Sequence, residues 1–316
     1  MTSPFHKGEL AVQAQSGVLD EAAMLGKMFR SYMTEQHREF FAQLPMLLVG
    51  SMDDAGQPWA SMLFGSPGFV HSPDVLTLQV DAQPAQDDPL RAALRIGASL
   101  GVLGIQLQTR RRNRMNGRVQ KLTSQGFTLE VEQSFGNCPK FISARTPQWR
   151  EDMPLTAAAN IQAGRLSDAA AALVTRADTC FIASASAPAF EADDTREGVD
   201  VSHRGGKPGF VRVQRAPDTT RLYMPDFPGN KAFNTLGNIA RYPRAGLLVP
   251  DFASGDVLSL ACNAEILWDG PELARFQGAE RMLVLSVQRG LYFPRLMPFR
   301  WTQPLPGPHV ERTGSW

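Results

Sequence analysis

Short hydrophobic runs separated by polar and glycine-rich turns dominate the first half of the chain. They predict strands over residues 46–51, 59–64, 69–71, 75–80, 100–107, 112–122 and 127–133. The runs 59–64 and 69–71 are expected to pair as a hairpin through GSPG. Helical spacing predicts helices over 19–30, 34–43 and 88–96, whereas FHKGELAVQAQSG (5–17) predicts an irregular polar arm. Many short strands at close spacing are typical of a small barrel or sandwich.

The second half of the chain repeats the first. PGFV at 67–70 recurs at 208–211, MLLVGS (46–51) matches TCFIAS (179–184), and LGVLGIQL (100–107) aligns with RAGLLVPDF around Gly246. The alanine-rich segment 166–176 repeats the helix that enters the first copy. Two copies of one barrel are therefore predicted, with residues 1–155 forming the first and 156–316 the second. Fused copies of a symmetric dimer would form a pseudo-dimer of this kind.

Residues 198–239 carry the strongest local signals. GVDVSHRGGKPGFVRV alternates like two strands around a glycine bend and predicts a second hairpin. Asn230 is expected to be the N-cap of a helix that starts at Lys231 and ends before the Tyr242-Pro243 pair. Because free N–H groups, the helix dipole and an ammonium group would converge there, this helix start is a candidate phosphate site.

The two copies differ in where they carry positive charge. As a strand, TRRRNRMNGRV (109–119) places alternate side chains on one side of the sheet, and the equivalent stretch GDVLSLACNAE lacks these charges. The alternating set is Arg110, Arg112, Arg114, Asn116 and Arg118. The second copy instead has Arg204, Lys207 and the Gly-Asn-Lys helix start. Each copy thus holds half of a basic pocket, and a composite site between them is predicted. A solvated edge strand and an RNA-binding or targeting patch are the alternatives for the arginines.

Composition narrows the function classes. The 316 residues are 43% hydrophobic and 20% charged with a net charge of +1, which argues against a general nucleic-acid binder. No apolar run reaches the roughly 20 residues of a membrane span. The three cysteines are too few and too scattered for a disulfide framework or zinc cluster, and we expect a cytoplasmic protein. No histidine spacing predicts a metal site. Cys138, with no histidine near it in the sequence, is expected to be a packed turn residue rather than a nucleophile.

The spaced motifs of both halves resemble a known superfamily. They are TRRRNRMNGR and FGNCPK in the first half, and DVSHRGGKPGF and GNKAFNTLGNI in the second. They resemble the tandem, flavin-nucleotide-binding branch of the pyridoxamine 5′-phosphate oxidase-like, FMN-binding split-barrel superfamily. The resemblance implies a mainly β fold with flanking helices (α+β), built as two tandem split β-barrels that form a pseudo-dimer.

The resemblance also implies where the cofactor binds. FMN would lie between the barrels, with the strand at 200–204 along the flavin, the helix start taking the phosphate and the strand at 110–117 approaching from the other barrel. The implied cofactor-binding residues are Asp200, Ser202, His203, Arg204, Lys207, Asn230, Lys231, Arg110, Arg112, Arg114 and Asn116. Ser202 is the better candidate for a hydrogen bond to the flavin, and His203 lies on the opposite face of the strand.

The expected function is that of an FMN-binding oxidoreductase acting on an unknown small molecule. A flavin would carry out the redox chemistry itself, which explains why no set of catalytic side chains stands out. The family's oxidase ends in a tryptophan and arginine tail, whereas FPRLMPFRWTQPLPGPH keeps only Arg300 and Trp301, so the substrate stays open. The alternatives are a non-catalytic flavin or haem carrier or sensor, and an interaction module. We expect one flavin per chain, room for a homodimer, and no nucleic-acid or membrane partner.

Overall fold

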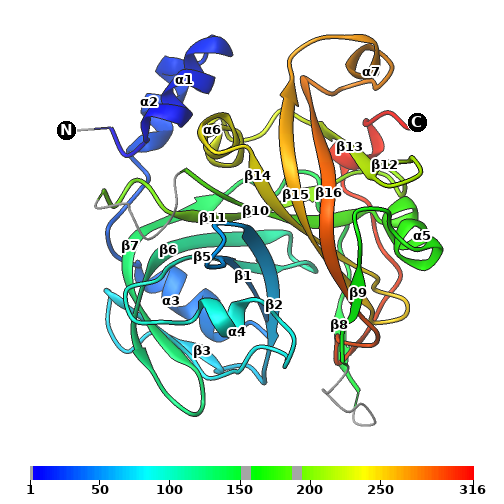
Figure 1. Ribbon diagram of the computed structural model, residues 1–316. Helices are drawn as coiled ribbons and strands as arrows, with labels where there is room; N and C mark the ends of the chain where they lie inside the picture. Colours follow the sequence, from blue (N-terminus) through cyan, green and yellow to red (C-terminus); the bar gives the residue numbers. More distant parts are fainter. Residues whose placement is uncertain (1–2, 151–157, 187–193) are drawn as a thin grey trace.

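The computed structural model describes residues 3–150, 158–186 and 194–316 (Figure 1). Its helices are α1 (Lys7–Gln15), α2 (Leu19–Gly26), α3 (Glu35–Ala42), α4 (Leu90–Ala93), α5 (Asp168–Arg176), α6 (Asn234–Arg241), α7 (Pro271–Ala274) and α8 (Pro308–Glu311). None of the helices in these described ranges is long and apolar enough to cross a bilayer.

Strands form most of the secondary structure, so the protein is mainly β, as predicted. In the first half they are β1 (Met46–Met52), β2 (Pro58–Phe64), β3 (Val70–His71), β4 (Thr77–Val80), β5 (Ser99–Gln106), β6 (Arg111–Leu122) and β7 (Phe127–Asn137). They continue as β8 (Pro147–Trp149), β9 (Asn160–Gln162), β10 (Thr179–Ala185), β11 (Val199–Gly205), β12 (Arg212–Arg215) and β13 (Thr220–Asp226). The last are β14 (Arg244–Pro250), β15 (Val257–Leu267), β16 (Arg281–Phe293) and β17 (Phe299–Trp301). The strands and the three helices predicted for the first half are confirmed, although α2 and α4 are shorter than expected.

Two large antiparallel sheets have the same strand order. The first runs β2-β1-β5-β6-β7-β4-β3, and the second runs β11-β10-β14-β15-β16-β13-β12, with β9 added against β16. The sheet of the first half curls around α3 and α4 (Figure 1). Each strand of the first order has its counterpart at the same place in the second, in agreement with the sequence alignment of the two halves.

Both predicted hairpins are wrong, and for the same reason. β2 pairs with β1 and β3 with β4, while β11 pairs with β10 and β12 with β13. A side chain on Gly65 would clash with the ring of Phe69, and one on Gly206 would clash with Phe210. In each bend a phenylalanine packs over a glycine, and the chain then crosses from one edge of the sheet to the opposite edge. A local turn signal does not reveal this crossing.

The two sheets contact each other reciprocally. A Cβ on Gly101 of β5 would lie 2.5 Å from the carbonyl oxygen of Val199, next to β11's Asp200. A Cβ on Gly246 of β14 would lie 2.5 Å from the carbonyl oxygen of Pro58, in β2. Each sheet thus presses a glycine against the backbone of the other sheet's edge strand. These contacts bring β11 close to β5 and β6.

The N-terminal arm is helical, contrary to the expectation of an irregular segment. α1 begins with His6 as its N-cap, and the Glu9 side chain accepts a hydrogen bond from the backbone of His6 to complete a capping box. α1 packs closely on α6, since a Cβ on Gly237 would lie only 2.5 Å from the backbone nitrogen of Glu9. Two glycines, Gly8 and Gly237, allow this close approach. The arm therefore buries His6 and Glu9 against α6.

Candidate functional site

A pocket of about 90 Å³ lies where the two halves meet. Its walls come from β6 and the end of β7 in the first half, and from β11, the end of β13 and the start of α6 in the second. We call it the arginine pocket. Seven of the residues predicted from the sequence line it: Arg112, Arg114, Ser202, His203, Arg204, Asn230 and Lys231.

The other four predicted residues lie elsewhere. Asp200 and Asn116 lie behind the wall and hydrogen-bond to each other. Arg110 precedes β6 with a φ of 56°, and its guanidinium donates to the carbonyl oxygens of Ile142 (3.0 Å) and Leu305 (2.9 Å). Lys207 follows β11 and does not line the pocket. The alternation of the arginine strand therefore holds from Arg112 onward but not at Arg110.

A buried carboxylate fixes Arg114 in place. Arg114 Nη1 donates to Asp200 Oδ1 at 2.9 Å, and Asn116 Nδ2 donates to the same oxygen at 2.7 Å. Asn238 Nδ2 of α6 donates to the other oxygen at 2.9 Å. The second Arg114 nitrogen reaches Ser202, whose hydroxyl also receives a hydrogen bond from Thr235 at 3.1 Å. Asp200 therefore ties β6, β11 and α6 together and orients one wall of the pocket.

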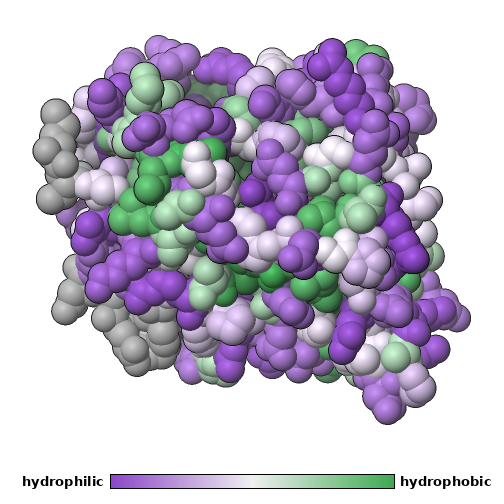
Figure 2. All heavy atoms as spheres, turned by 90° about the horizontal axis from the view of Figure 1, so that it is seen from above, coloured by the Kyte–Doolittle hydropathy of each residue, from purple (hydrophilic) through white to green (hydrophobic). Residues whose placement is uncertain are grey.

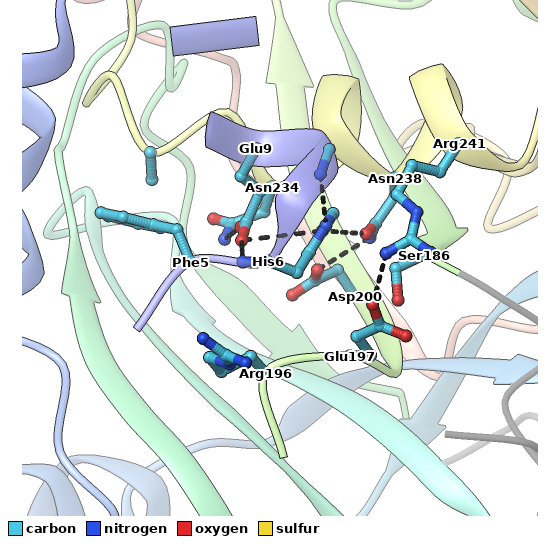
Figure 3. A network of polar contacts seen from close by, with 12 residues as sticks. Phe5, His6, Glu9, Ser186, Arg196, Glu197, Asp200, Asn234, Asn238 and Arg241 are labelled. Atoms are coloured by element: carbon cyan, nitrogen blue, oxygen red, sulfur yellow. Dashed lines mark hydrogen bonds and ion pairs between the residues drawn. The ribbon is translucent and has the colours of Figure 1, made fainter. Parts of the chain in front are cut away.

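The residues that complete this network on the side of the N-terminal arm were not predicted from the sequence. Figure 3 shows His6, the N-cap of α1, and Glu9 of α1 pointing toward Asn234 and Asn238 of α6. His6 Nε2 lies 2.8 Å from Asn238 Oδ1, and Asn234 donates to Glu9. Burial raises the pKa of the Glu9 carboxyl well above its usual range, and Asp200 adds to this effect. The i, i+4 spacing of the two asparagines on one helix face was the available signal.

Two further arginines of the pocket are held by single strong contacts. Arg112 Nε donates to the carbonyl oxygen of Cys138 at 2.7 Å, and its Nη2 lies 3.5 Å from the Cys138 sulfur. Arg204 Nη1 donates to Asp226 at 2.8 Å, and the same carboxylate accepts from Arg281 at 3.0 Å. Burial is the main cause that lowers the pKa of the Arg112 guanidinium. Asp226 is shared between two cations, so the pocket keeps an excess of positive charge.

His203 is buried in the wall without a hydrogen-bond partner for either ring nitrogen among the described residues. Its ring meets Phe181 edge to face at 5.6 Å. Burial holds the pKa of the imidazole well below its usual range, and Arg112 and Arg204 lower it further. The ring is therefore neutral, and it contributes one donor and one acceptor but no charge.

The predicted helix start is wrong. α6 begins at Asn234 after Phe233, and both Lys231 (φ 64°) and Phe233 (φ 62°) adopt left-handed conformations that a helix cannot include. Asn230 is therefore not an N-cap, and its side chain accepts a hydrogen bond from Ala232 instead. Lys231 Nζ lies 3.0 Å from Glu21 Oε1 of α2, and both side chains are exposed.

Figure 2 shows, from above, the face of the molecule that carries α1, α2 and α6 at the top of Figure 1. This face is mostly hydrophilic, with hydrophobic areas between the polar ones.

The arrangement suits a phosphate or a similar anion. Four cationic side chains and one carboxylate line the pocket, beside the first turn of α6. The Nε atoms of Arg114 and Arg204 and the side-chain nitrogen of Asn137 are buried without an acceptor among the described residues. At about 90 Å³ the pocket is smaller than the roughly 150 Å³ cavity that holds one benzene ring. It therefore fits the phosphate of FMN, whereas the flavin ring needs space beyond it.

The equivalent position, between β2 of the first half and β15 of the second, lacks the cations. Ser61 occupies the register position of β2 that Ser202 occupies in β11, and its hydroxyl donates to the buried Asp88 carboxylate at 2.5 Å. The counterpart of Arg114 is Ser259, whose hydroxyl donates to the backbone of β2. Burial raises the pKa of Asp88 to about 6. A carboxylate and a serine thus replace the cations, and this position does not suit an anion.

No protein-family model matches the chain, and no curated protein matches it in sequence. Among solved structures, a Lactobacillus delbrueckii protein named provisionally as a pyridoxamine 5′-phosphate oxidase aligns with 46% of this chain and 99% of its own, at 14% identity and a TM-score of 0.29. HupZ of Group A Streptococcus aligns with 39% of this chain and 90% of its own, at 11% identity and a TM-score of 0.29. These scores are too low to carry an argument about function.

Within the described residues, no group of three or more His, Cys, Asp or Glu side chains could hold a metal ion. The arginine pocket is therefore the candidate functional site of the described residues.

Proposed function

We propose that the chain binds FMN with its phosphate in the arginine pocket and acts as an FMN-dependent oxidoreductase on a small molecule. Residues 1–155 and 156–316 would be two fused split barrels, with the pocket formed between them. The identical strand order of the two sheets and their reciprocal glycine contacts support this duplication.

The observation that carries the proposal is the convergence of charge from both halves. Arg112 and Arg114 come from β6, while Arg204 and Lys231 come from the second half, and all four line one small pocket. Arg112 makes no ion pair with a described carboxylate, and Arg204 shares Asp226 with Arg281, so an anion would balance the remaining positive charge. Guanidinium groups suit phosphate oxygens. Donors without acceptors in the same wall support a ligand rather than a purely structural cluster.

Each residue of the wall has a distinct role in this proposal. Arg112, Arg204 and Lys231 would hold the phosphate, and Arg114, fixed by Asp200, would present its free Nε to the same ligand. The hydroxyl of Ser202 would bind the ribityl chain. His203, being neutral, would donate or accept a hydrogen bond without adding charge. When bound, a flavin supplies hydride or electron transfer itself, so the protein needs to position it and shelter it.

The proposal includes one FMN per chain. The equivalent position, between β2 of the first half and β15 of the second, carries Asp88 and Ser259 in place of the cations. We also propose a cytoplasmic location, which the three free cysteines support. A homodimer is compatible with the proposal, because the arginine pocket is complete within one chain.

A specific observation favours a second candidate, a non-catalytic haem-binding protein. His203 is neutral and has an unpartnered ring nitrogen among the described residues, and an axial iron ligand requires both. The small volume of the pocket weighs against a haem in it. The cationic walls favour FMN over haem as the ligand.

An absorbance spectrum of the purified chain, with the released cofactor quantified, tests both candidates. Flavin bands at about one equivalent per chain, and turnover of an electron acceptor by the reduced protein, would support the oxidoreductase. A Soret band that is lost in His203→Ala would favour the haem protein. A colourless chain that also fails to take up added FMN would contradict the proposal.

A further inference from the structure

A second pocket lies beside the C-terminal tail, and the proposed function does not use it. Its volume is about 240 Å³, compared with about 90 Å³ for the arginine pocket. The walls come from the end of α5, the loop after β11, the turn between β14 and β15, and residues 301–304. We call it the tail pocket. It brings together segments that are far apart in the sequence.

Most of the wall is apolar or aromatic. The rings of Phe252 and Trp301 meet edge to face at 5.0 Å, and Leu173, Pro208 and Pro250 complete the apolar surface. Aromatic walls of this kind stack against flat ligands and favour them over extended ones. The shape of the wall therefore suits a planar molecule.

Two buried donors in the wall have no acceptor. Trp301 Nε1 and Arg145 Nε make no hydrogen bond with any described residue, and Arg145 is only 5% exposed. Leaving a buried donor unpaired costs about 1–3 kcal/mol. An acceptor atom on a ligand would satisfy these donors, so the ligand should carry a carbonyl oxygen or a ring nitrogen.

The charges of the tail pocket cancel, unlike those of the arginine pocket. Arg145 is paired with Asp178 and stacks over the ring of Phe252 at 3.9 Å. Arg176 is paired with Asp251. Both cations already have a carboxylate partner, so an anionic ligand would meet no excess of positive charge. The pocket therefore suits an uncharged molecule.

We propose that the tail pocket binds an uncharged, planar aromatic molecule of one or two rings, oriented by hydrogen bonds from Trp301 Nε1 and Arg145 Nε. The size follows from the volume, because a cavity of roughly 150 Å³ holds one benzene ring. The chemical class follows from the aromatic wall, the two free donors and the balanced charges.

Three probes of similar size test this proposal. Benzamide is uncharged and carries an acceptor, benzoate is anionic, and toluene has no acceptor. The chain has five tryptophans, and the Trp301 indole N–H resonance can be assigned by its loss in Trp301→Phe. Benzamide at millimolar concentration should shift this resonance, with an affinity about tenfold higher than that of benzoate or toluene. An unshifted Trp301 resonance, or tighter binding of benzoate, would overturn the proposal.

A second variant tests the binding site without altering Trp301. Ala253 is exposed at the rim of the tail pocket, so Ala253→Phe should block the pocket without disturbing the core. Well-dispersed indole N–H resonances in the spectrum of Ala253→Phe show that the variant is folded. Benzamide binding should be lost in Ala253→Phe. Binding that persists unchanged in this variant would place the probe elsewhere and overturn the proposal.

Discussion

Arg114 Nη1 lies 2.9 Å from Asp200 Oδ1, and the two residues belong to opposite halves of the chain. Both are buried, with 2% and 7% of their surface exposed. A buried charge needs a counter-ion, so each half of the chain supplies the counter-ion for the buried charge of the other half. Asp200 acts as a positioning residue, because it orients Arg114 at the wall of the arginine pocket without lining the pocket itself.

Replacing Asp200 with asparagine should destabilise the fold strongly. The variant keeps the shape of the side chain but leaves Arg114 as a buried charge without its counter-ion, which costs about 3 kcal/mol. Urea unfolding measures this loss. Glu35→Gln is the matched control, because it removes an exposed pair with Arg38 and should cost less than about 1 kcal/mol. Equal stability of the two variants would contradict the account.

The reciprocal contact between the sheets predicts two equivalent positions at which any side chain destabilises the fold. Gly101→Ala and Gly246→Ala each place a methyl group 2.5 Å from a carbonyl oxygen of the other sheet. Each should lower the free energy of unfolding by about 1–3 kcal/mol. Gly136→Ala is the control, since the nearest atom is 3.7 Å away. A harmless change at either of the first two positions would show that the sheets do not pack this way.

Asp88 should make the free energy of unfolding depend on pH. Its pKa in the folded protein is raised from 3.8 to about 6, so between these values the unfolded chain loses a proton that the folded chain keeps. Stability therefore falls as the pH rises through this window. Asp88→Asn should flatten the profile by about 2 kcal/mol between pH 4 and 6, measured by urea unfolding. The exposed neighbour, Asp87→Asn, should follow the wild type.

Lys231 should take part in ligand binding more than in stability. Its exposed pair with Glu21 contributes little to folding, because water screens the two charges. Lys231→Ala should weaken FMN binding by about tenfold with little change in stability. Glu21→Gln removes a carboxylate that competes with the phosphate for Lys231, so it should strengthen FMN binding about two- to threefold. Weaker FMN binding in Glu21→Gln would contradict a role for Lys231 in holding the phosphate.

The sequence could predict the part of the site that depends on local periodicity and on the internal repeat. Strand alternation places Arg112 and Arg114 on one side, and the differences between the copies single out Arg204 and Lys231. The structure brings all four to one pocket. The sequence could not predict contacts between elements that are distant in the chain, such as His6 and Glu9 against α6. Nothing in the sequence of the N-terminal arm shows where the arm packs.

The errors in the predicted elements have physical causes as well. Histidine is not among the preferred N-cap residues, so His6 did not signal the start of α1. Asn230 is a preferred cap, but the left-handed conformations of Lys231 and Phe233 delay the helix to Asn234. Such conformations in residues other than glycine cannot be read from sequence.

The most direct test of the central claim compares FMN with riboflavin, which differs from it by the phosphate. Isothermal titration should show FMN binding at least about a hundredfold more tightly, since several charge-assisted hydrogen bonds depend on the phosphate. Arg204→Gln should weaken FMN binding about tenfold and leave riboflavin binding unchanged, while Arg215→Gln, outside the pocket, should alter neither. Equal affinities for FMN and riboflavin in the wild type would contradict a phosphate site in the arginine pocket.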